Sequence, residues 1–130
     1  MTRTAFALCA LLAGCAAQQR SIAYQGATIA RQIADDGAAE WKRGVEAQVE
    51  HCKATVPKES STKAQREECL GVFNETDKAT KIFEAIVAAQ KAVYWALKFG
   101  EMGDVRDALS ELDGVLQDAK PFLEAARKAR

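Results

Sequence analysis

Residues 104–129 decide the fold, and they read DVRDALSELDGVLQDAKPFLEAARKA. Apolar side chains recur here at alternating spacings of three and four, which keeps them on one face of a helix as in a heptad seam. The members of this seam are Met102, Val105, Leu109, Leu112, Leu116, Ala119, Leu123 and Ala126. The pattern predicts a helix over about 104–129 with Asp104 as its N-cap. Pro121 should kink or restart this helix near Lys120.

Two further helical segments precede this one. The segment over about 20–54 carries a row of apolar or small residues at a spacing of four: Ile29, Ile33, Gly37, Trp41, Val45 and Val49. Gly37 follows two aspartates, and it either breaks this helix or lets a neighbouring helix come close; the sequence leaves both readings open. Thr62 and Gln65 fit a capping box, which predicts a second helix over about 62–99 that ends at Gly100.

The composition agrees with a helical domain. The chain has 130 residues, 48% of them apolar, and only two prolines. Its 18 basic and 18 acidic side chains balance, which argues against a nucleic-acid-binding or disordered protein. Short connections between three helical segments make antiparallel neighbours, so we expect an all-α, elongated up-down-up three-helix bundle after an N-terminal signal peptide.

The N-terminus has the pattern of an export signal. Arg3 precedes an apolar stretch over residues 5–13, and small residues follow it. The end of this stretch and the two residues after it, Leu12-Ala13-Gly14-Cys15, resemble the lipobox of bacterial lipoproteins. A plain secretory signal and a buried N-terminal helix are the alternatives.

The resemblance implies how the chain is processed. In that class the cysteine thiol, here that of Cys15, receives a diacylglyceryl group, and a dedicated peptidase removes the signal before it, here residues 1–14. Residues 15–130 would then form the mature single helical domain, held to the membrane as a lipoprotein bearing acyl chains such as palmitate. Because Ala16 rather than aspartate follows the cysteine, the resemblance implies the outer membrane, facing the periplasm.

Two cysteines stay in the domain after processing, since Cys9 leaves with the signal. Cys52 and Cys69 form an even pair in an oxidising compartment, so a disulfide between them is expected. It would close the loop around Pro57 at the end of the bundle away from Cys15. A cytoplasmic chain would instead keep two free thiols.

No catalytic constellation, metal site or cofactor motif is found, so we expect a protein that is not an enzyme. His51 adjoins Cys52, but the disulfide would consume the thiols that a metal site needs. Asp35 and Asp36 are adjacent in sequence, and helical neighbours diverge rather than converge on a substrate.

Tyr94 and Trp95 are adjacent and therefore cannot both face the core, which makes them a candidate partner surface. We accordingly expect a membrane-anchored, non-enzymatic interaction or structural module of the cell envelope. Its partner would be an envelope protein or a second copy bound through the helix at 104–129, and not a nucleic acid. The alternative is a helical bundle, of host or phage origin, that holds a small ligand or lipid between its helices.

Overall fold

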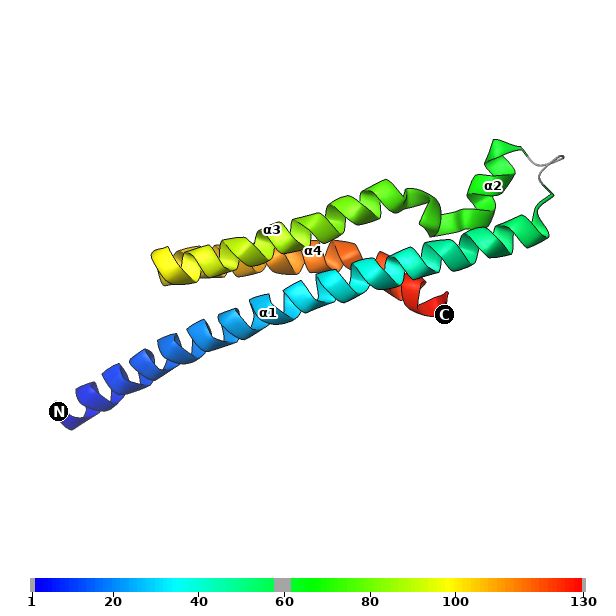
Figure 1. Cartoon of the computed structure of the whole chain (residues 1–130). Helices are drawn as coiled ribbons and strands as arrows, with labels where there is room; N and C mark the ends of the chain where they lie inside the picture. The colour runs from blue at the N-terminus through cyan, green and yellow to red at the C-terminus, as the bar shows by residue number, and fades with distance from the viewer. Residues whose placement is uncertain (1, 58–61, 130) are drawn as a thin grey trace.

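The computed structural model confirms an all-α three-helix bundle. It describes the backbone of residues 2–57 and 62–129 and the side chains of residues 18–57 and 62–129. The elements are α1 (Thr2–Thr55), α2 (Lys63–Leu70), the 3-10 helix η1 (Gly71–Glu75), α3 (Thr76–Phe99) and α4 (Met102–Lys128). Figure 1 shows the up-down-up course: α3 returns alongside α1, and α4 runs back packed against both. The connection at α2 and the turn between α3 and α4 lie at opposite ends of the molecule.

α1 is one continuous helix that passes through Gly37. A Cβ atom added at Gly37 would lie 2.6 Å from Cδ2 of Leu123 and 3.0 Å from Cε1 of Phe83. Helices α3 and α4 both press on this point, so Gly37 provides space for close packing and does not break the helix.

The buried face of α1 differs from the predicted row. Between residues 23 and 44 the buried positions are Ala23, Ala27, Ala30, Ala34, Gly37, Trp41 and Gly44, which alternate at spacings of four and three, and Cys52 is buried farther along. Ile29, by contrast, is 56% exposed. A row spaced by exactly four advances roughly 40° around a helix at each step and leaves the buried face, whereas the alternating pattern stays on it.

The second predicted helix was correct in its ends and wrong in its continuity. The capping box forms as predicted: Gln65 N donates to Thr62 Oγ1 (3.2 Å), and Thr62 N donates to Gln65 Oε1 (2.9 Å). Gly71 then adopts a φ of 58°, which interrupts the α-helix. The chain therefore forms α2, η1 and α3 in place of one helix, and Gly100 follows as the C-cap of α3, its N–H bonded to the carbonyl of Ala96.

α4 begins earlier than predicted. Its N-cap is Glu101 rather than Asp104, and Asp104 Oδ2 accepts a hydrogen bond of 2.8 Å from the backbone N–H of Glu101. The helix continues through Pro121 without a restart. The seam predicted from residues 102–126 packs inside the chain's own core, where Val105, Leu112 and Ala119 are fully or nearly fully buried.

Large aromatic side chains fill the core in the half of the bundle near α2. The ring of Trp41 lies 4.8 Å from the ring of Phe73 and 5.3 Å, edge-on, from that of Phe122. These are favourable aromatic geometries. Toward the turn between α3 and α4, the buried face of α1 consists instead of four alanines, Ala23, Ala27, Ala30 and Ala34.

Candidate functional site

The predicted cysteine pair is joined in the structure. Cys52 at the end of α1 and Cys69 in α2 form a disulfide with a Cα–Cα distance of 6.0 Å. Gln48, one turn before Cys52, donates from Nε2 to the carbonyl of Cys69 (2.8 Å). The pair thus ties α2 to the end of α1, and residues 58–61 of the intervening loop lie outside the described residues.

Cys15 lies in α1 on the side of the turn between α3 and α4. The side chains of the predicted lipobox, residues 12–15, are outside the described set. Arg20 Nη1 donates to the carbonyl of Leu97 (3.0 Å), which aligns the last turn of α3 with residue 20 of α1. In Figure 1 the blue start of α1 continues past the yellow end of α3 with no other element beside it.

Tyr94 and Trp95 have different surroundings. The hydroxyl of Tyr94 lies 2.6 Å from Thr28 Oγ1, and its ring centroid lies 5.3 Å from that of Tyr24. Thr28 Oγ1 also donates to the carbonyl of Tyr24 (3.0 Å), so the Tyr94 hydroxyl is the donor in their shared bond. Tyr94 therefore joins α3 to α1, and its ring is half-buried.

Trp95 is the exposed member of the pair, with 69% of its surface accessible. Its ring centroid lies 4.6 Å from that of Phe99, which is itself 63% exposed. The ammonium of Lys98 lies 5.3 Å from the Phe99 centroid. Phe99 was not predicted as part of a partner surface, although its spacing of four from Trp95 places both on one helix face.

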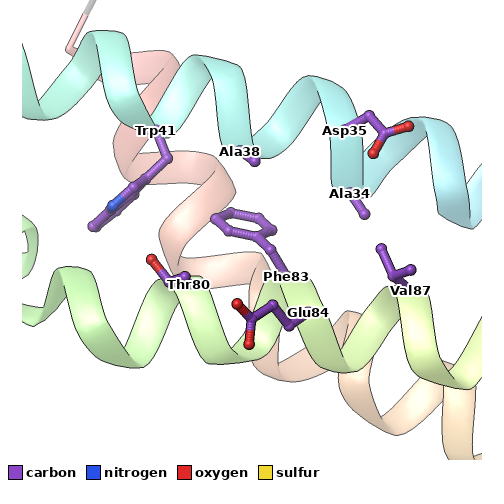
Figure 2. A pocket seen from close by; sticks show the side chains of 8 residues that line it. All are labelled: Ala34, Asp35, Ala38, Trp41, Thr80, Phe83, Glu84 and Val87. Carbon is purple, nitrogen blue, oxygen red and sulfur yellow. The ribbon is translucent and has the colours of Figure 1, made fainter.

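A separate hollow lies between α1 and α3 in the middle of the bundle (Figure 2). It has a volume of about 230 Å³. The residues lining it are Ala34, Asp35, Ala38, Trp41, Thr80, Phe83, Glu84 and Val87. Figure 2 shows Phe83 and Val87 reaching from α3 toward α1, while the carboxylate of Asp35 turns outward.

The hollow also carries polar groups. Asp35 is paired with Arg31 at 3.2 Å. The indole Nε1 of Trp41 is buried and has no hydrogen-bond partner among the described residues. Thr80 and Glu84 lie one turn apart on α3, and both line the hollow.

His51 is exposed on α1 and takes part in no metal-binding cluster. Among the described residues, no three histidine, cysteine, aspartate or glutamate side chains gather as metal ligands would. No helix in the described part of the chain is long and apolar enough to cross a bilayer.

Comparisons of the chain with protein-family models, curated proteins and solved structures gave no match.

Proposed function

We propose that this chain is the precursor of a membrane-anchored envelope lipoprotein, cut before Cys15, whose helical bundle serves as a non-enzymatic interaction module. The motif at Leu12–Cys15 supports the anchor, and Ala16 supports an outer-membrane location on the periplasmic side. The Cys52–Cys69 disulfide fits that oxidising compartment.

One observation carries the proposal: the bundle begins after the motif. Among the described side chains of α1, which start at residue 18, the first buried one is Ala23, and the contact of Arg20 with Leu97 lies five residues beyond Cys15. Removal of residues 1–14 and attachment of lipid to Cys15 would therefore leave these contacts in place. Several acyl chains on one cysteine would hold the bundle stably at the membrane surface.

Separate replacement of Cys15 and of Cys9 by serine tests the lipid anchor. Cys15→Ser should abolish lipid attachment and leave residues 1–14 uncleaved, because the thiol is the acceptor. Cys9→Ser makes the same change within the apolar stretch and should leave processing unaltered. Labelling of cells with radioactive palmitate, followed by immunoprecipitation, reads both; equal label in Cys15→Ser and the unmodified chain would contradict the proposal.

The residue after the cysteine tests the membrane. Ala16→Asp should move the protein from the outer to the inner membrane fraction, since aspartate at that position is the retention signal that the lipoprotein resemblance implies. Ala17→Asp adds the same charge one residue later and should leave the protein in the outer membrane. Sucrose-gradient fractionation distinguishes the two, and identical distributions would count against the assignment.

A second function is favoured by the hollow beside Trp41, whose wall is mostly apolar. In this function the bundle holds a small apolar molecule against the side chains of Trp41, Phe83 and Val87. Native mass spectrometry of the protein from membranes should then find a retained ligand. Ala38→Phe, which fills the hollow, should abolish retention, while Ala39→Phe on the exposed face should not; bare protein in every case would contradict this function.

A further inference from the structure

The outer face of α3 carries an apolar stripe near its end. Ala88, Ala92, Trp95 and Phe99 are all exposed, and their spacings of four, three and four align them on one side of the helix. The opposite side of α3 supplies the core through Ile86 and Val93, both fully buried. The last three turns of α3 are thus apolar on two faces, although the bundle covers only one.

The stripe is confined to one end of the molecule. Nearer the start of α3, the exposed residues on its outer side include the charged Lys78, Lys81 and Glu84. The apolar stripe begins only at Ala88 and reaches the last residue of α3 at Phe99. This is the end at which Arg20 of α1 contacts Leu97, next to Cys15.

Distances along the helices place the stripe beside the anchor. Arg20 lies five residues after Cys15, or roughly 7.5 Å along a helix that rises 1.5 Å per residue. Because the Tyr94 ring contacts Tyr24, its neighbour Trp95 lies at about the level of residue 24 of α1. That level is nine residues after Cys15, or roughly 14 Å along the helix. The polar layer on each side of a bilayer is about 5–7 Å deep, so the bundle has to lean toward its α3 side for both rings to enter it.

The chemistry of the stripe matches a lipid interface. Aromatic rings concentrate at the level of the lipid headgroups, and lysines flanking them reach phosphate groups while their stems stay on apolar surface. Lys91 and Lys98 are exposed on the same side of α3, and the Lys98 ammonium lies beside the Phe99 ring.

We propose that the Ala88–Phe99 stripe of α3 docks onto the headgroup layer of the membrane that holds Cys15, so that the bundle leans on its anchor membrane through Trp95 and Phe99. This inference rests on the proposed lipid anchor. The anchor alone would leave the bundle free to rotate and tilt; the stripe fixes which side faces the lipid, and it leaves the disulfide end free in the periplasm.

The two tryptophans allow a direct test in the anchored full-length mature protein. Trp95 lies in the stripe, whereas Trp41 is 4% exposed and roughly 39 Å along α1 from Cys15. The protein is reconstituted in phosphatidylethanolamine–phosphatidylglycerol vesicles with lipid brominated at a shallow acyl position, and its fluorescence is compared with that of Trp95→Phe, in which only Trp41 emits. The emission assigned to Trp95 should shift to shorter wavelength and be quenched by the bromolipid, while that of Trp41 should not change.

A matched pair of charge substitutions isolates the stripe. Ala92→Asp, in the stripe, should remove most of the bromolipid quenching of Trp95. Ala39→Asp places the same charge on the exposed face of α1 away from the anchor and should leave the quenching unchanged; circular dichroism checks that both variants are folded.

Three results would overturn the inference. The first is a Trp95 that the bromolipid does not quench and that acrylamide reaches as freely as it reaches N-acetyltryptophanamide. The second is a Trp95 protected from acrylamide but untouched by bromolipid, which would mean that a second copy covers the stripe. The third is equal quenching in Ala92→Asp and Ala39→Asp. The intact mass of the same sample shows separately whether Cys15 carries lipid. If it does not, sedimentation of the unlipidated chain with vesicles tests the stripe alone.

Discussion

The two ends of the bundle use large side chains in opposite ways. Near the disulfide, Trp41, Phe73 and Phe122 are buried and in mutual contact. Near Cys15, the seam of α1 is alanine, and the large residues Trp95 and Phe99 lie on the surface. Burial of aromatic rings stabilises a fold, whereas exposed rings in an aligned stripe indicate a surface that binds something. We therefore assign stability to the end near the disulfide and binding to the end near Cys15.

The largest difference between the ends should appear when each tryptophan is removed. Trp41→Ala deletes a buried ring that packs against two others, and it should lower the free energy of unfolding by about 3–5 kcal/mol. Trp95→Ala should change it by no more than about 0.5 kcal/mol, because that ring is mostly in solvent. Urea unfolding followed by circular dichroism measures both, and equal losses would erase the contrast between the two ends.

Removal of the disulfide tests the same difference between the two ends of the bundle. Cys52 and Cys69 are 17 residues apart, and a loop of this size is worth about 3 kcal/mol in the chain-entropy model. The Cys52→Ser, Cys69→Ser double variant should lose that stability in urea. Its hydrogen exchange should rise first in α2 and at the end of α1, and a uniform rise along all helices would contradict a local role.

The glycines of α1 sharpen the comparison further. Gly37→Ala places a Cβ 2.6 Å from Leu123 and 3.0 Å from Phe83, and the overpacking against the Phe83 ring, about 1–3 kcal/mol, should exceed the roughly 0.5–1 kcal/mol that alanine gains over glycine in a helix. Gly26→Ala meets nothing within 4 Å, so it should stabilise the helix by about 0.5–1 kcal/mol. Urea unfolding of the pair should therefore give changes of opposite sign, and the same sign in both would show that the close approach at Gly37 is not tight.

The smallest predicted difference between a variant and its matched control concerns Tyr94 near the Cys15 end. Tyr94→Phe removes the hydroxyl that donates to Thr28 and should cost about 0.5–1 kcal/mol, the lower part of the range for a hydrogen bond, because the bond is solvent-exposed. Tyr24→Phe is the matched control on the facing ring. A loss in thermal stability for Tyr24→Phe as large as that for Tyr94→Phe would show that ring contact, not the hydrogen bond, joins α3 to α1 there.

Much of this fold could be predicted because its signals are local. The seam of α4, the capping box at Thr62 and the end of α3 at Gly100 each depend on a few neighbouring residues. The buried face of α1 could not be predicted correctly, because the larger side chains Ile29 and Ile33 give a stronger hydrophobic signal than the alanines that are buried. Small residues allow helices to approach closely, and that advantage depends on the helix across the interface and not on α1 itself.

The candidate sites divide in the same way. The pairing of Cys52 with Cys69 follows from counting cysteines, and the contrast between Tyr94 and Trp95 follows from adjacency on a helix. The break at Gly71 depends on a positive φ that the sequence allows but does not require. The hollow beside Trp41 is formed by α1 and α3 together, so no segment of sequence carries its signal.

The intact mass of the protein, extracted from membranes in detergent and measured before and after reduction, tests the central claim most directly. We expect a mass equal to residues 15–130 plus lipid, which rises by about two protons when the Cys52–Cys69 bond is reduced. A mass equal to the full unlipidated chain, unchanged by reductant, would contradict the anchor, the compartment and the disulfide together.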